Sequence, residues 1–153
     1  MSEAHIVQII PHLYIGDRYS VISREDYLTQ YNIQVVISAL TEEEYADYII
    51  GREDFDDHII WHRLVLDDDP SEPIHTLFSR TNNIITEALA ANKNVLVHCS
   101  AGISRSVTIV AAYLVNGGHV RTPAEAVSLI QRRRPYASPN NGFWKALVAS
   151  TPP

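Results

Sequence analysis

The chain has 153 residues, of which 46% are hydrophobic and 20% are charged, and its formal net charge is -6. This length and composition predict one globular domain spanning residues 1–153 and exclude a disordered or fibrous chain. The acidic total also argues against a nucleic-acid binder that works by neutralising many phosphates.

Runs of β-branched and aromatic residues predict the strands of the first half of the chain. They are expected at residues 5–10, 13–16, 33–40 and 58–66. Ser23 is a typical helix N-cap, so a helix is expected over residues 23–31. The acidic segment 41–57 fits neither a helical nor a strand pattern clearly, and its structure stays open.

Helices dominate the second half of the chain. Apolar residues at helical spacing predict a helix over 74–92, and a short strand is expected at 93–99. Further helices are expected at 104–118, 122–134 and 138–150. The first of these should end at Gly117 or Gly118, and Thr122, Pro123 and Glu125 form a capping-box start signal for the second. Strands that alternate with helices predict an α/β fold, with helices flanking a central, mostly parallel sheet.

The single cysteine of the chain lies between the strand 93–99 and the helix 104–118. A strand, a tight loop at Gly102 and a helix beginning near Ser104 bring backbone N–H groups together at a helix N-terminus, which attracts anions. Thiols at such positions ionise with pKa values of roughly 3.5–7.5, compared with about 8.5 for a free thiol. We therefore expect Cys99 to rest as a thiolate.

The sign of the charge changes at this loop. Residues 1–98 contain six Lys and Arg against seventeen Asp and Glu, whereas residues 99–153 contain six against one. The positive excess suits a small bound anion. Arg105 offers a planar fork of donors that matches two oxygens of a tetrahedral anion. Ser106 can donate to the sulfur, and His98 can fix the loop through backbone groups.

These residues carry a family resemblance. The segment HCSAGISRS matches the His-Cys-x-x-Gly-x-x-Arg-Ser signature of the cysteine-based protein tyrosine phosphatases. The segments IIPHLYIG, AAYLV and RRRPYASPNNGF are similar to the dual-specificity branch of that superfamily, so the resemblance covers nearly the whole chain. It implies a protein tyrosine phosphatase-like fold and a small, atypical dual-specificity phosphatase.

The resemblance also implies a role for each residue of the loop. Cys99 matches the nucleophile that forms a cysteinyl-phosphate, Arg105 the clamp on the phosphoryl oxygens, and Ser106 the hydroxyl that eases departure of the thiolate. His98 and Asn140 would orient the loop, and Asn140 would also cap the last helix. The backbone that would cradle the phosphoryl group belongs to Ser100, Ala101, Gly102, Ile103, Ser104 and Arg105.

The family further uses an aspartic acid on a separate upstream loop, first as general acid and then as base. The triplet DDD at residues 67–69 lies in that region. The register of the following helix favours Asp68, while Asp67 and Asp69 remain alternatives. The triplet can also be read as a solvated turn without a catalytic role.

The expected substrates are proteins that carry phosphotyrosine, phosphoserine or phosphothreonine, and neither a metal nor an organic cofactor is implied. No membrane association is expected, because every apolar run is much shorter than the stretch of about 20 residues that a membrane-spanning helix needs. The N-terminal segment lacks the features of a signal peptide, so a cytoplasmic location is expected, with access to the nucleus left open. The sequence sets neither the physiological substrate nor the oligomeric state.

Two other functions remain open from the sequence. The first is hydrolysis of a phosphate ester that is not a protein, and the second is a phosphate-binding interaction module with negligible turnover. The three arginines 132–134 also have two interpretations. They can be favourable charges at a helix C-terminus, or a docking site for acidic or doubly phosphorylated substrates.

Overall fold

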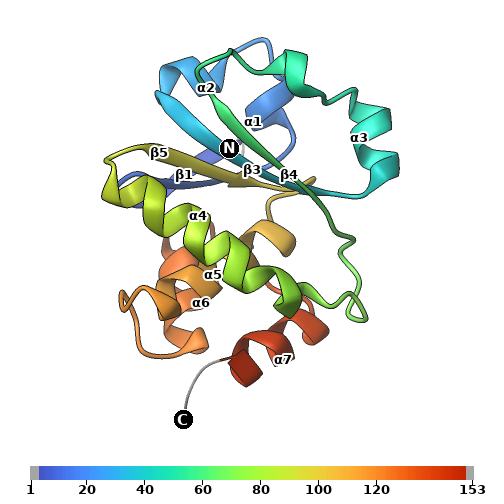
Figure 1. Ribbon diagram of the computed structural model, residues 1–153. Helices are drawn as coiled ribbons and strands as arrows, with labels where there is room; N and C mark the ends of the chain where they lie inside the picture. The colour runs from blue at the N-terminus through green and yellow to red at the C-terminus, as the bar shows by residue number, and fades with distance from the viewer. Residues whose placement is uncertain (1–3, 151–153) are drawn as a thin grey trace.

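In the computed structural model, which describes residues 4–150, a five-stranded sheet carries helices on both faces (Figure 1). The strands are β1 (Ile6–Ile10), β2 (Leu13–Gly16), β3 (Ile33–Leu40), β4 (Ile60–Val65) and β5 (Asn94–His98). Their order is β1-β2-β5-β3-β4, and only the β1–β2 pair is antiparallel. The predicted α/β architecture with a mostly parallel sheet is confirmed.

The central strand β5 places the cysteine. Val95 and Val97 belong to the core on one face of the sheet and Leu96 to the core on the other, as the two-residue period of a strand requires. An uninterrupted apolar strand is typical of the buried middle of a parallel sheet. Because β5 ends at His98, Cys99 emerges at the carboxyl edge of the sheet, where α/β proteins usually bind their ligands.

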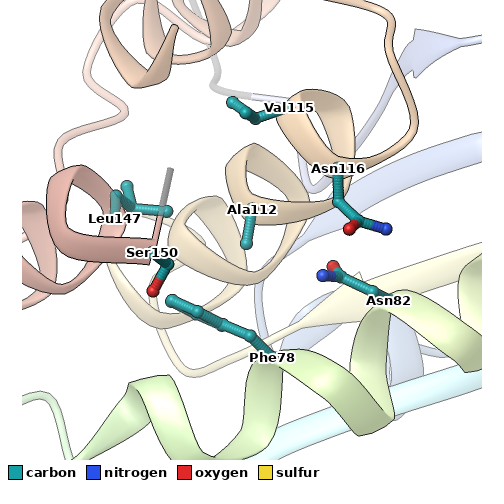
Figure 2. A pocket seen from close by; sticks show the side chains of 7 residues that line it. All are labelled: Phe78, Asn82, Ala112, Val115, Asn116, Leu147 and Ser150. Carbon is teal, nitrogen blue, oxygen red and sulfur yellow. The ribbon is translucent and has the colours of Figure 1, made fainter. Parts of the chain in front are cut away.

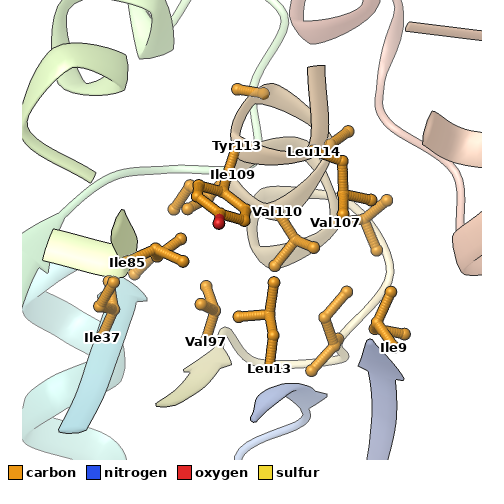
Figure 3. Close-up of a cluster of buried hydrophobic side chains, with 14 of the residues drawn as sticks. Ile9, Leu13, Ile37, Ile85, Val97, Val107, Ile109, Val110, Tyr113 and Leu114 are labelled. Carbon is orange, nitrogen blue, oxygen red and sulfur yellow. The ribbon is translucent and has the colours of Figure 1, made fainter. Parts of the chain in front are cut away.

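The longer helices cover one face of the sheet. They are α4 (Phe78–Ala90), α5 (Arg105–Asn116), α6 (Pro123–Arg133) and α7 (Asn141–Ser150), and the 3₁₀-helix η2 (Ile74–Leu77) precedes α4. Figure 3 shows Val110 of α5 pointing toward the strands that carry Leu13 and Val97. Helix α5, which is expected from the sequence, is buried from Arg105 to Leu114.

Shorter helices cover the opposite face, on the side of Leu96. They are α1 (Tyr19–Ile22), α2 (Tyr27–Gln30), α3 (Glu42–Tyr48) and the 3₁₀-helix η1 (Arg52–Asp54). Helix α3 lies within the acidic segment that the sequence left open. The helix begins with a capping box formed by Thr41 and Glu44. The Glu44 N–H donates to Thr41 Oγ1 at 3.1 Å, and the Thr41 N–H donates to Glu44 Oε1 at 2.8 Å.

Two expectations about helix starts were wrong. Of the helix expected over 23–31 only the short helix α2 forms, because Ser23 has an extended backbone that ends the preceding α1 and Asp26 has a left-handed φ of 50°. The side chain of Thr122 does cap α6, but the Glu125 carboxylate accepts from the Arg121 N–H instead of closing the capping box. The expected end of α5 is confirmed, with Gly117 as its C-cap. Within residues 4–150, no helix combines the length and the apolar character needed to cross a membrane.

Candidate active site

The loop from Cys99 to Ser104 makes a tight turn at Gly102. The φ of Gly102 is 67°, and a Cβ there would lie 2.7 Å from Arg134 Nη2 and 2.9 Å from the Gly16 carbonyl oxygen. Glycine is therefore required both by the conformation and by the space.

The backbone groups of this loop divide into two sets. Carbonyl oxygens of the loop accept hydrogen bonds from three groups that lie outside it. These donors are the Arg18 N–H, the Arg134 side chain and the Ser138 N–H. In the part of the chain that the structure describes, no protein group accepts from the N–H groups of residues 100–105. Unpaired donors at the start of a helix are the kind of groups that can bind an anion.

Cys99 is the first residue of this loop, and 2% of its surface is exposed. The Ser106 Oγ, in the first turn of α5, lies 3.2 Å from the Cys99 Sγ. A thiolate can only accept in such a pair, so the Ser106 hydroxyl donates to the sulfur when Cys99 is ionised.

Arg105 is the first residue of α5, and its guanidinium is buried against Glu44. The terminal nitrogens Nη1 and Nη2 donate to the two carboxylate oxygens of Glu44 at 2.5 and 3.0 Å, and Nη1 also donates to the Leu66 carbonyl at 3.0 Å. The Arg105 Nε is buried without an acceptor among the described residues. Because a guanidinium has five N–H groups, the Nε–H and one Nη2–H remain for two oxygens of a ligand.

The charges of this pair are strongly stabilised. Burial alone would raise the pKa of Glu44, but the hydrogen bonds from Arg105 and from the Thr41 backbone lower it to about 2. Burial alone would lower the pKa of Arg105, but Glu44, Cys99 and Asp68 raise it. A carboxyl group with a lowered pKa stays ionised until the pH falls toward that value, so the ion pair persists through neutral and mildly acidic pH.

His98 fixes the start of the loop through a directed chain of hydrogen bonds. Its Nδ1 lies 3.2 Å from the Cys99 carbonyl oxygen, which can only accept, so Nδ1 carries the proton. In the neutral imidazole, Nε2 accepts from the Ser38 hydroxyl at 2.5 Å, and Ser38 Oγ in turn accepts from Trp61 Nε1 at 2.9 Å. With a neutral imidazole the chain of hydrogen bonds from Trp61 to the Cys99 carbonyl is thus complete.

Burial lowers the pKa of His98 from 6.5 to about 4, although its bond to the Cys99 backbone opposes the shift. The unfolded chain therefore takes up a proton at His98 before the folded chain does. We expect this residue to remove up to about 3 kcal/mol of stability as the pH falls from its unfolded pKa to its folded one. Replacement by asparagine, which has no charged form, should flatten that decline in urea unfolding curves at about pH 7.5 and about pH 5. The exposed His75→Asn variant is the control, and parallel pH dependences in wild type and His98→Asn would contradict the assignment.

Asp68 lies on the exposed loop between β4 and η2, and Asn140 connects it to the cysteine loop. The Asn140 Nδ2 donates to Asp68 Oδ1 at 2.9 Å, and the Asn140 backbone N–H donates to Ser104 Oγ at 3.0 Å. Its Oδ1 accepts from the Phe143 N–H at 2.9 Å and so caps α7. One asparagine thus joins three segments that are far apart in the sequence.

The neighbouring aspartates have other surroundings. Asp69 Oδ1 accepts from both the backbone N–H and the hydroxyl of Ser71, at 2.8 and 2.6 Å, and these bonds lower the pKa of Asp69. A carboxyl group held ionised in this way is a poor proton donor. The Asp67 N–H donates to Glu72 within the same loop.

Two residues next to the loop have roles in the structure that the sequence did not predict. Arg134 was grouped with two other arginines, but it is 1% exposed and its side chain donates to the carbonyls of Gly102, Ala101 and Ala4. The docking interpretation is therefore wrong for Arg134, whose side chain instead holds backbone carbonyl groups of the cysteine loop. Glu44 had one usable signal, the Thr-x-x-Glu capping pattern, and that pattern says nothing of the pairing with Arg105.

A cavity of about 300 Å³ lies between α4, α5 and α7 (Figure 2). It is lined by Phe78, Asn82, Ala112, Val115, Asn116, Leu147 and Ser150. None of these residues belongs to the cysteine loop or to the Asp68 loop, so the cavity is separate from the candidate active site. Among residues 4–150, no three His, Cys, Asp or Glu side chains gather as metal ligands would.

Comparison with known proteins identifies the family of the chain. The family described as "Dual specificity phosphatase, catalytic domain" matches residues 13–151. Tyrosine-protein phosphatase yvh1 of Schizosaccharomyces pombe is 48% identical over 84 residues, which are 55% of this chain and 25% of that protein. Human dual specificity protein phosphatase 1 is 32% identical over 93% of this chain, which spans 36% of that protein. The chain thus spans only about a quarter to a third of these relatives.

Solved structures show the same likeness. The human tyrosine phosphatase-like serine/threonine/tyrosine-interacting protein superposes with a TM-score of 0.84 at 29% identity, over 93% of this chain and 92% of that one. DUSP15 superposes with a TM-score of 0.80 at 30% identity, over 94% of this chain and 85% of that one. The expected protein tyrosine phosphatase-like fold is confirmed.

Proposed function

Because the chain belongs to the family of dual-specificity phosphatase catalytic domains, we propose that it hydrolyses phosphate monoesters of phosphotyrosine and of phosphoserine or phosphothreonine in proteins. One observation carries the proposal. Cys99, whose sulfur lies 3.2 Å from the Ser106 hydroxyl, begins a loop in which six successive backbone N–H groups, those of residues 100–105, have no acceptor among the described residues. This arrangement suits a nucleophile and a phosphoryl group better than a buried structural thiol.

In the first step the Cys99 thiolate attacks phosphorus, the P–S bond forms and the ester P–O bond breaks. The electron pair of that bond stays on the leaving oxygen, which takes a proton from the Asp68 carboxyl group. The hydrogen bond from Asn140 orients Asp68 for this transfer. The free N–H groups of Arg105 and of the loop stabilise the charge that builds up on the three remaining phosphoryl oxygens.

In the second step Asp68, now ionised, takes a proton from water while the water oxygen attacks phosphorus. The P–S bond breaks, its electron pair returns to sulfur, and inorganic phosphate leaves. The Ser106 hydroxyl donates to the departing thiolate and so lowers the energy of that charge. No step requires a metal ion.

A phosphate-binding module is the second candidate, favoured by the description of one structural neighbour as a phosphatase-like interacting protein. The presence of Cys99, Arg105 and Asp68 favours turnover, since binding alone needs neither a nucleophile nor a proton donor.

The proposal is tested by hydrolysis of p-nitrophenyl phosphate in EDTA, followed by peptides of one sequence that carry phosphotyrosine, phosphoserine or phosphothreonine. We expect wild-type turnover that EDTA does not reduce, and a loss of at least about 10³-fold in Cys99→Ser. Binding of phosphate without turnover would favour the interaction module. Turnover of the aryl ester but of no peptide would favour a substrate that is not a protein.

A further inference from the structure

The first turn of α7 lies unusually close to the Asp68 loop. A Cβ added at Gly142 would be 1.9 Å from the Pro70 carbonyl oxygen and 2.6 Å from the Pro70 carbonyl carbon and Cα. Real Cβ atoms do not approach backbone atoms this closely, and the atoms here are main chain, which cannot rotate away. Gly142 is therefore the position where the helix and the loop come into direct backbone contact.

This contact lies beside the polar connection already described. Asn140 donates to Asp68 two residues before Gly142, and Pro70 follows Asp68 by two residues. The Asn140–Asp68 hydrogen bond is exposed, so by itself it holds the loop only weakly. The close backbone packing at Gly142 supplies a second, steric restraint on the same loop.

Helix α7 is itself held firmly. Phe143 and Leu147 are buried in the main core, together with Ile74 of η2, the element that follows the Asp68 loop. A side chain at position 142 would therefore displace the exposed loop and not the helix, which these two buried side chains anchor.

We infer that Gly142 is a positioning residue for the general acid, because its missing side chain lets the Asp68 loop approach the cysteine loop. The inference rests on the proposed function. A larger residue has to move Pro70 by on the order of 1 Å, a misplacement that can cost about 10²-fold in rate at a reacting centre. Asp68 lies two residues from Pro70 and moves with it.

The test is Gly142→Ala, assayed on two esters that differ in leaving group. Phenolate is a poor leaving group that needs the proton, whereas p-nitrophenolate leaves without much help. We expect kcat/KM, which covers the steps up to cleavage of the ester bond, to fall about 10- to 100-fold on phenyl phosphate and less than about threefold on p-nitrophenyl phosphate. Asp68→Asn should show the same pattern, and the double variant should lose little more than Asp68→Asn alone because both changes remove one function.

Lys145→Ala, an exposed change on the same helix, is the matched control and should leave both rates unchanged. Alanine is the better helix former, so the thermal midpoint of Gly142→Ala should not fall if only the exposed loop moves. Asn140→Ala removes the polar connection but keeps the backbone contact, and it should lose less rate on phenyl phosphate than Gly142→Ala.

Three results would overturn the inference: equal losses on both esters, a wild-type rate of Gly142→Ala on phenyl phosphate, or a larger loss in Asn140→Ala. If wild type cleaves neither ester, the proposed function fails and this inference fails with it. Wild-type turnover with any of the three results rejects only the role of Gly142.

Discussion

Replacing Arg105 by lysine is expected to lower kcat/KM for aryl phosphates by about 10²–10³-fold while the chain stays folded. Arg105 uses the end of its guanidinium to hold Glu44 and the Leu66 carbonyl, and its side edge keeps two N–H groups for a ligand. Only a planar group with donors on two edges can do both.

Lysine has a single ammonium group that cannot meet both demands. The Glu44 carboxylate, whose pKa is lowered to about 2, would attract that ammonium and draw it away from the phosphoryl oxygens. The loss should therefore appear in kcat, since the transition state carries more charge on those oxygens than the bound ester does.

Two companion variants sharpen this test. Arg132→Lys, an exposed change in the last turn of α6, should leave kcat/KM unchanged. Glu44→Gln keeps Arg105 but replaces its ion pair with a weaker hydrogen bond. The loss of kcat/KM in Glu44→Gln should therefore lie between those of Arg132→Lys and Arg105→Lys. An Arg105→Lys enzyme within a few-fold of wild type would contradict the bidentate role of this residue.

The parts of the site that could be predicted lie close together in the sequence. The cysteine, the glycine, the arginine and the serine all fall within residues 99–106, so their spacing alone encodes a strand, a turn and a helix start. The apolar strand before them and the apolar helix after them also indicate that both elements are buried. Local pattern was therefore enough for the loop and for the α/β fold around it.

The supports of the loop could not be predicted, because they come from distant segments. Glu44 lies 61 residues from Arg105, and Arg134 lies 32 residues from Gly102. An acidic residue in a charged segment and an arginine among three arginines look like ordinary surface residues. Only the packing of α3 and of the segment after α6 against the loop separates them from their neighbours.

Some local signals were ambiguous for a different reason. A serine such as Ser23 can cap a helix or stabilise a turn with the same hydroxyl, and here it accepts from the Glu25 N–H after α1 has ended. The glycine in the first turn of α7 gives no sequence signal of its function either. Its importance follows from the Pro70 backbone beside it, which belongs to another loop.

The central claim concerns the charge of one sulfur. Cys99 begins a loop whose N–H groups have no acceptor among the described residues, at the start of a helix, and such surroundings favour a thiolate. Because the chain has a single cysteine, every alkylation event reports on this residue. The same chain unfolded in urea is the internal reference for an ordinary thiol.

The most direct measurement is the rate of alkylation by iodoacetamide as a function of pH, followed by mass and by phosphatase activity. We expect one adduct, faster alkylation of the folded chain than of the unfolded chain at neutral pH, slowing by inorganic phosphate, and loss of activity in proportion to labelling. Equal alkylation rates of the folded and the unfolded chain, or an alkylated protein that still cleaves aryl phosphate, would contradict a nucleophilic thiolate at Cys99.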